Sequence, residues 1–87
     1  MPKFERKDGS LTVYAFMCGY IQRHQSKKRD IRIDLYHEGA VYQVRRFDAS
    51  LPYLEWNAEG SGRRWESFET LTEARKQFAK WKHEIDN

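Results

Sequence analysis

The side chains that most often carry catalysis or bind metal ions are scarce in this chain. There is one cysteine, Cys18, and there are three histidines, His24, His37 and His83. None of the four stands at the spacing of paired metal ligands, such as C-x2-C or H-x3-H, so we expect no metal site. Cys18 lies in the apolar run VYAFMC, without a neighbouring base or cation that would activate a thiol. We therefore expect Cys18 to be a buried and unreactive core residue.

Phosphate-loop and acid–base chemistry also lack candidates. The stretch EGSGRR, residues 59–64, contains G-x-G, but it has no third glycine and does not open a helix directly. No pair of carboxylates stands in an apolar setting, where the two would be tuned to act as an acid and a base. The sequence therefore predicts a protein that is not an enzyme and that uses no cofactor.

Basic side chains are the remaining candidates, and they are concentrated in the first half of the chain. Residues 1–47 contain ten Lys and Arg against five Asp and Glu, whereas residues 48–87 contain six against eight. The excess is greatest in RHQSKKRDIR, residues 23–32. Such a cluster either attracts the phosphate backbone of DNA or RNA or simply keeps a loop solvated. The candidate cations are Arg23, Lys27, Lys28, Arg29 and Arg32, together with the pairs Arg45-Arg46 and Arg63-Arg64.

Aromatic residues make up 15% of the chain, which is enough for some rings to lie at the surface. Exposed Tyr and Trp side chains are common at protein interfaces and where bases stack, although small domains also fill thin cores with rings. We expect Tyr36 and Tyr53 to be exposed anchors for a partner, with an arginine beside them. Trp65 is expected to pack in the core.

The chain is expected to fold as a single domain over residues 1–87, with the polar residues 1–10 loosely ordered. The longest apolar run is too short to span a bilayer, and the first ten residues lack the apolar centre of a signal peptide. A single cysteine fits a reducing compartment. These features predict a cytoplasmic protein that does not associate with membranes.

Two segments predict the first strands of a sheet. The segment LTVYAFMCGYIQRH, residues 11–24, is apolar on both alternating faces and fits either a strand covered on both sides or a buried helix. Residues 31–47 predict a β-hairpin around a tight turn at Glu38-Gly39, with one apolar and one polar face. The expected cross-strand pairs are Leu35 with Tyr42, Ile33 with Val44, Ile31 with Arg46, and Arg32 with Arg45.

The last part of the chain predicts two short strands and a helix. Residues 53–58 and 63–68 are the expected strands, joined by the turn EGSG, and residues 70–85 are the expected helix. The helix would begin with a capping box of Thr70 and Glu73. Its apolar residues form one stripe, which must cover a sheet. The predicted fold is therefore α+β, an antiparallel sheet of four or five strands with one C-terminal helix packed across a face. The stripe consists of Leu71, Ala74, Phe78, Trp81 and Ile85.

The run YQVRRF…EWNAEGSGRRWESFETLTEARKQFAKWK resembles the hairpin-plus-helix pattern of small DNA-binding modules. These are the amino-terminal Arm-type domain of tyrosine integrases and, less closely, the WGR domain. In both, a sheet ends in an aromatic-x-x-Phe segment that is followed by T-x-x-E-A and a helix. Here the corresponding stretch is RRWESFETLTEARKQF, without a Trp-Gly-Arg triplet. The resemblance implies a DNA-binding protein. In size and style the chain is also similar to short accessory proteins of phages and plasmids, including anti-CRISPR and other host-defence inhibitors.

Two functions are therefore predicted. The first is a non-enzymatic accessory module that binds DNA or RNA through the basic loop at residues 23–32 and the arginine pairs. The alternative is a small phage or mobile-element inhibitor that binds a host protein, for example a nucleic-acid enzyme. The localised basic excess favours the first, because most small protein inhibitors of nucleic-acid enzymes mimic the polyanion and are acidic, whereas this chain is basic.

Overall fold

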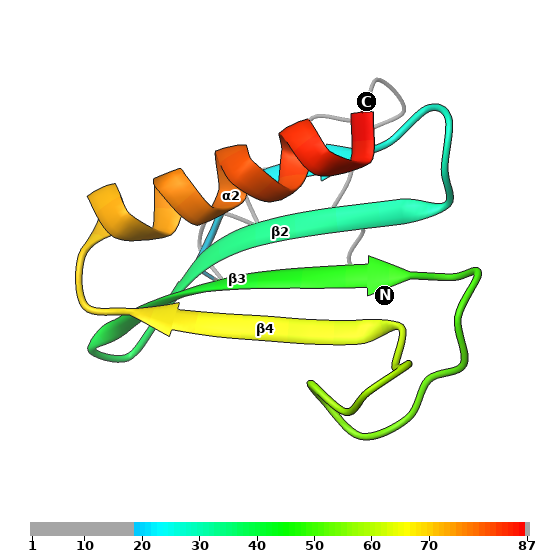
Figure 1. Cartoon of the computed structure of the whole chain (residues 1–87). Helices are drawn as coiled ribbons and strands as arrows, with labels where there is room; N and C mark the ends of the chain where they lie inside the picture. The colour runs from blue at the N-terminus through cyan, green and yellow to red at the C-terminus, as the bar shows by residue number, and fades with distance from the viewer. Residues whose placement is uncertain (1–18, 87) are drawn as a thin grey trace, which may run out of the picture.

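A computed structural model describes residues 19–86 of the chain. They form an open antiparallel sheet of four strands in the order β1-β2-β3-β4, with one helix packed across a face (Figure 1). The predicted α+β fold is confirmed. The elements are β1 (Tyr20–Gln25), β2 (Ile31–Glu38), β3 (Val41–Asp48), β4 (Arg63–Phe68) and α2 (Leu71–Asp86).

The core lies between α2 and the face of the sheet that α2 covers. In β2, the alternating residues Ile31, Ile33 and Leu35 belong to the core cluster, and each is at most 4% exposed. Val44 of β3 pairs with Leu35 and is fully buried. Burial of this apolar surface is the main driving force for folding. The helix contributes its predicted stripe, with Ala74, Phe78, Trp81 and Ile85 buried and Leu71 packed against them.

The helix α2 begins directly after Thr70, whose side chain caps it as predicted. The Thr70 hydroxyl accepts a hydrogen bond from the backbone N–H of Glu73 at 3.2 Å and donates one to the Glu73 carboxylate at 2.9 Å. The carboxylate therefore binds the hydroxyl, whereas in a capping box it binds the backbone N–H of the capping residue. No helix within the described part of the chain is long and apolar enough to cross a membrane.

The β2–β3 hairpin has the predicted faces but not the predicted register. Leu35 pairs with Val44, and Arg32 pairs with Phe47, so each partner lies two residues away from the expected one. Side chains alternate along a strand with a period of two, so a shift of two residues leaves every side chain on its face. The division into an apolar and a polar face is therefore right, and the cross-strand partners are wrong.

The turn of this hairpin lies one residue further along than predicted. Glu38 and Val41 are the last paired residues, which leaves Gly39 and Ala40 as a two-residue loop. Gly39 has a φ of 59°, a left-handed conformation that glycine adopts without steric cost. A glycine at the first central position is typical of a type II′ turn, whose twist suits a hairpin.

The segment 11–24 was predicted to be either a strand or a buried helix. The structure describes residues 19–24 of it and decides between the two for that part. From Tyr20 onward the segment is a strand that pairs with β2. The ladder is irregular between Tyr20 and Gln22, and the residue between them, Ile21, packs against the core. The rest of the segment, including Cys18, lies outside the described residues, as do residues 1–10.

The predicted strand at residues 53–58 does not form. Residues 49–62 are instead a loop that folds back on β4. Among residues 19–86, Asn57 is the single non-glycine residue with a positive φ, 63°, which interrupts an extended segment. The backbone N–H of Asn57 donates to the Arg63 carbonyl at 3.0 Å, and its Oδ1 accepts from the backbone N–H of Trp65 at 2.9 Å. Asn57 thus occupies part of the outer edge of β4.

Phe78 tests the packing of the helix on the sheet. It lies in the middle of α2, is 4% exposed and belongs to the core cluster. The substitution Phe78→Ala should lower the free energy of unfolding by about 3–5 kcal/mol, because it removes a buried ring and leaves a cavity. Urea denaturation followed by circular dichroism measures the change. The control is Lys76→Ala at an exposed position of the same helix, with an expected effect of at most about 0.5 kcal/mol. Equal urea midpoints for the two variants would contradict this core.

Candidate functional site

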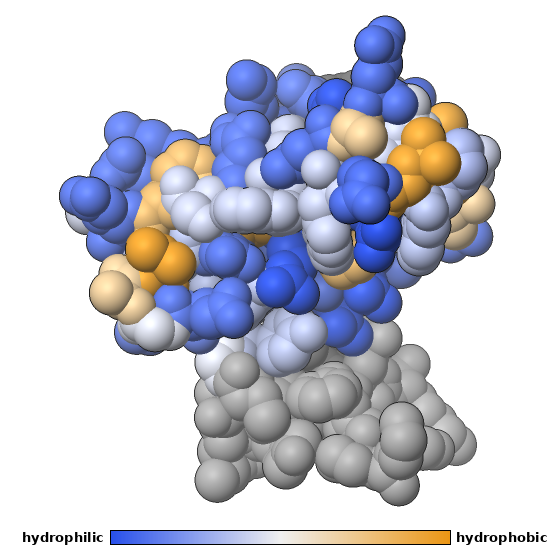
Figure 2. Space-filling model, turned by 90° about the horizontal axis from the view of Figure 1, so that it is seen from below, coloured by the Kyte–Doolittle hydropathy of each residue, from blue (hydrophilic) through white to orange (hydrophobic). Residues whose placement is uncertain are grey.

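The face of the sheet opposite α2 gathers most of the predicted site residues. No helix from residues 19–86 covers it, and we call it the helix-free face. Strand alternation brings them together, since every second side chain of a strand points to the same face. Figure 2 looks onto this face and shows hydrophilic side chains across its centre, interleaved with paler residues of intermediate hydropathy. The helix-free face comprises Arg23 of β1, Arg32, Asp34 and Tyr36 of β2, Gln43, Arg45 and Phe47 of β3, and Arg63 and Trp65 of β4.

A buried carboxylate, Asp34, lies near the centre of the helix-free face and is 1% exposed. Arg23 donates to it twice, from Nε to Oδ1 at 2.7 Å and from Nη2 to Oδ2 at 3.4 Å. The Nε atom of Arg32 lies 3.3 Å from Oδ2, close enough for an ion pair but without hydrogen-bond geometry. Because the Arg23 side chain is only 8% exposed, its guanidinium group serves Asp34 and is not presented to a ligand.

Two other guanidinium groups lie over aromatic rings. The Arg45 guanidinium carbon is 4.5 Å from the ring centroid of Tyr36 and 5.4 Å from that of Trp56. The same atom of Arg32 is 4.6 Å from the ring centroid of Phe47. Attraction between a cation and the face of a ring favours this arrangement. The contacts hold both side chains in one place while leaving Arg32 37% and Arg45 33% exposed.

Arg63 holds the loop of residues 49–62 in place. Its Nε and Nη2 atoms both donate to the backbone carbonyl of Leu54, the former at 3.0 Å. Its guanidinium carbon also lies 5.2 Å from the ring centroid of Trp56 and 5.8 Å from that of Tyr53. Because these N–H groups are bound within the protein, Arg63 orders the site and is a poorer candidate for direct contact with a ligand than its sequence position suggested.

Tyr36 is buried, so the prediction of an exposed ring was wrong. The residue is 7% exposed, and its hydroxyl donates to Oε1 of Gln43. That oxygen also accepts from Nη2 of Arg45 at 3.4 Å. Burial raises the pKa of Tyr36 from 10.0 to about 12, against the opposing effect of the Arg45 charge. The other predicted anchor, Tyr53, is 58% exposed.

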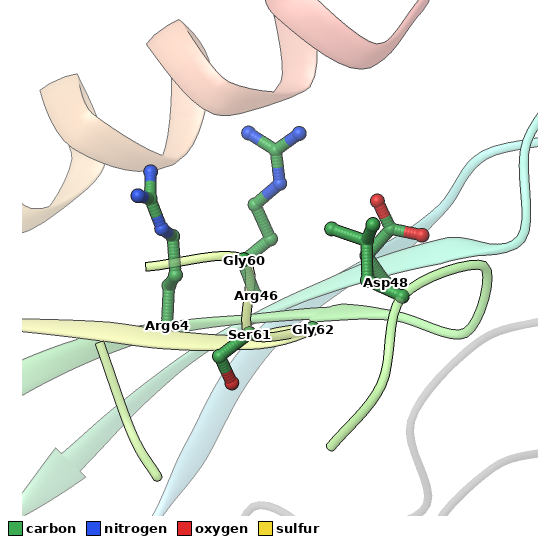
Figure 3. A pocket seen from close by; sticks show the side chains of 7 residues that line it. Arg46, Asp48, Gly60, Ser61, Gly62 and Arg64 are labelled. Carbon is green, nitrogen blue, oxygen red and sulfur yellow. The ribbon is translucent and has the colours of Figure 1, made fainter. Parts of the chain in front are cut away.

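The two arginine pairs are divided between the two faces of the sheet. Arg45 and Arg63 lie on the helix-free face, whereas Arg46 and Arg64 point to the side of α2 (Figure 3). Arg46 forms an ion pair there with Glu84 of α2 at 3.4 Å. The four arginines therefore do not form one cluster, because consecutive residues of a strand point to opposite faces.

The predicted basic loop at residues 23–32 includes the ends of β1 and β2, so the loop itself is residues 26–30, and from here on this segment is called the basic loop. It presents its cations to solvent. Its shape depends on Ser26, which is 5% exposed and whose backbone N–H donates to the carbonyl of Ile31 at 3.0 Å. The Ser26 hydroxyl accepts hydrogen bonds from two backbone N–H groups of the loop, at 3.3 and 3.1 Å. The exposed cations are Lys27, Lys28 and Arg29.

The basic loop and the loop of residues 49–62 lie at the same end of the sheet (Figure 1). A hydrogen bond of 2.9 Å from the backbone N–H of Ala49 to the carbonyl of Asp30 joins them. The cations of the basic loop therefore flank the end of the helix-free face at which the Arg63-bound loop lies.

Two rings of this site, Phe47 and Trp56, were not among the predicted site residues, and a third, Trp65, was predicted in the wrong place. Phe47 and Trp56 contact each other edge to face, with ring centroids 5.6 Å apart. Trp65 is outside the core cluster and half-buried on the helix-free face, opposite Arg45. The alternation of the hairpin already assigned Phe47 to this face, so it could have been found. Trp56 lies in an irregular loop, which leaves no periodic signal.

Among residues 19–86, no three His, Cys, Asp or Glu side chains lie close enough together to hold a metal ion. Comparison of the chain with protein-family models, with curated proteins and with solved structures gives no significant match. The geometry and charge of the helix-free face and the basic loop are therefore the features that bear on function.

The charge of Asp34 is expected to hold the helix-free face together. Asp34→Asn should lower the free energy of unfolding by about 3–5 kcal/mol, because it removes the buried charge that pairs with both Arg23 and Arg32. Urea denaturation at neutral pH measures this. Glu38→Gln is the matched control, since the Glu38 carboxylate is 58% exposed and 3.9 Å from Arg45; its expected effect is at most about 1 kcal/mol. Similar losses in both variants would show that Asp34 does not have this role.

The raised pKa of Tyr36 predicts a loss of stability at high pH. The unfolded phenol loses its proton near pH 10, whereas the native phenol keeps it up to about pH 12. The native state therefore binds more protons over this interval, and the free energy of unfolding falls as pH rises through it. Tyr36→Phe should abolish this part of the fall, giving a shallower decline than wild type between pH 10 and 12 in chemical denaturation. Parallel declines would refute the assignment.

Proposed function

We propose that the protein is a nucleic-acid-binding module that contacts DNA or RNA through the helix-free face and the basic loop. The observation that carries the proposal is the interleaving of arginines with aromatic rings on the helix-free face. Arg32 lies over Phe47, and Arg45 lies over Tyr36 and Trp56, at centroid distances of 4.5 to 5.4 Å. Both guanidinium groups stay partly exposed, so they are ordered before any ligand arrives.

An ordered guanidinium group is well suited to phosphates and base edges. It is planar, permanently charged and weakly hydrated, and its N–H groups form paired hydrogen bonds with phosphate oxygens. Since ring contacts already fix the side chain, less rotamer freedom is lost on binding. The Nε atoms of Arg32 and Arg45 are buried. The Nη groups are therefore the ones that would contact a ligand.

The charge of this surface is also favourable. The buried acid of the face, Asp34, is compensated by Arg23 and Arg32. The basic loop adds its three exposed cations, with Asp30 as its one acidic residue. Cations in such a position bind a polyanion by releasing its condensed counterions, and this gives affinity that depends on salt more than on sequence.

Binding to a host protein is a second candidate function, favoured by one observation on the loop of residues 49–62. Three apolar residues of this loop are exposed, Leu51 by 43%, Tyr53 by 58% and Leu54 by 44%. Tyr53 has Arg63 beside it, and Tyr and Arg are frequent anchors at protein interfaces. A mobile-element inhibitor would use this loop. Protein binding through this loop would not explain the ordered arginines of the helix-free face or the exposed cations of the basic loop. Nucleic-acid binding is therefore the first proposal.

The basic loop should contribute phosphate contacts. Replacing Lys27, Lys28 and Arg29 together by Ala should weaken binding to every oligonucleotide to a similar extent. It should also reduce the slope of log K against log salt by up to about 0.9 per lost contact with duplex DNA. Fluorescence anisotropy with labelled duplex and single-stranded oligonucleotides, at several salt concentrations, measures both quantities.

The control for this experiment is Arg75→Ala with Lys76→Ala, at two exposed positions of α2 that belong to neither the helix-free face nor the basic loop. This variant should keep the wild-type affinity and slope. If wild type binds no oligonucleotide at low salt, the nucleic-acid proposal fails and the protein-binding candidate takes its place.

A further inference from the structure

A groove between β4 and α2 contains cations that the proposed function leaves unused. The groove, of about 480 Å³, shares the side chains of Arg46 and Arg64 with a smaller hollow of about 140 Å³ at the start of β4 (Figure 3). Lys80 of α2 lines the larger space as well. We call it the β4–α2 groove. It lies on the opposite side of the sheet from the helix-free face.

The two arginines of this groove are placed unfavourably unless something neutralises them. Arg46 and Arg64 are direct partners in the β3–β4 ladder, an arrangement that is destabilising for like charges. The carboxylate of Glu84 is 3.4 Å from Arg46 but 47% exposed, so it compensates little. The side chain of Arg64 is exposed and makes no hydrogen bond or ion pair with any residue from 19 to 86. This differs from Asp34 on the other face, where charges are matched within the protein.

The rest of the lining favours an oxyanion. Oδ1 of Asn57 accepts a hydrogen bond from the backbone N–H of Trp65. The Nδ2 group of Asn57 makes no hydrogen bond with residues 19–86, so it can donate to a ligand. Gln77 of α2 supplies a second carboxamide. The acids that line the groove are Glu66 and Glu84, so its three cations outnumber them and the net charge is positive.

We propose that the β4–α2 groove binds a phosphate group, held by Arg64 and Arg46 with Lys80 opposite. Paired N–H groups of a guanidinium match two phosphate oxygens, and a bound phosphate removes the repulsion between the two arginines. The phosphate belongs either to a nucleic-acid backbone that passes around the outer edge of β4 or to a free phosphorylated molecule. The first source rests on the function proposed above, whereas the phosphate site does not.

Arg64→Gln tests the site, because it removes the charge without breaking a contact within the described residues. Wild type should show saturable changes in the Nε–Hε NMR signals of Arg64 and Arg46 on titration with inorganic phosphate, but not with chloride at equal ionic strength. Arg64→Gln should weaken phosphate binding by about tenfold. Its urea midpoint should stay the same or rise, because the like-charge pair is gone. Arg75→Gln, exposed on α2 and outside the groove, should leave phosphate binding unchanged.

Oligonucleotide binding by the same variants distinguishes the two sources of phosphate. If Arg64→Gln lowers the salt slope for duplex DNA by about 0.9, the groove holds a backbone phosphate. If inorganic phosphate binds while oligonucleotide binding is absent or unaffected by Arg64→Gln, the site stands and takes a free phosphorylated molecule. The proposal is overturned if wild type shows no saturable response to phosphate, or if Arg64→Gln binds phosphate as tightly as wild type.

Discussion

Within residues 19–86 one helix packs on a four-stranded sheet, and this constraint governs the rest of the described structure. The apolar stripe of α2 covers one face, so within residues 19–86 the other face has no helix to exclude water. Its side chains pack on one another instead. Arginine stems and guanidinium groups cover aromatic rings, and the charged ends remain at the surface. These contacts between side chains order the helix-free face.

The same face also explains the register of the β2–β3 hairpin. In the expected register Arg32 would lie opposite Arg45, and two like charges would meet. In the observed register Arg45 lies opposite Asp34, and Arg32 lies opposite Phe47, the ring that its guanidinium covers. Asp34 is buried, and a buried charge is tolerated only when it is paired. Electrostatic pairing on the polar face therefore favours the observed alignment over one that would serve the apolar face equally well.

The parts of the structure that have a periodic pattern in the sequence could be predicted, and the parts without one could not. The stripe of α2 and the two faces of the hairpin are periodic signals, and both were predicted correctly. Of the predicted capping box at the start of α2, the bond from the Glu73 backbone N–H to the Thr70 hydroxyl forms, and the bond from the Thr70 backbone N–H to the Glu73 carboxylate does not. A shift by two residues changes no face, so apolar patterning does not reveal it; the repulsion between Arg32 and Arg45 was the available clue. The arginine pairs were grouped by proximity in sequence, although alternation sends Arg46 to the side of α2. Loop 49–62 depends on individual hydrogen bonds, which have no period.

Asn57 limits how a partner can be bound. An exposed edge strand offers backbone N–H and carbonyl groups to which another strand can add. At β4, Asn57 occupies the carbonyl of Arg63 and the N–H of Trp65, and it adopts a φ of 63° to do so. Strand addition there would have to displace these bonds. In the proposed function, recognition at the β4 edge would therefore depend on side chains. Those of β4 alternate between the ring-bearing helix-free face and the β4–α2 groove, so a ligand that follows this edge meets arginine on both sides of the sheet.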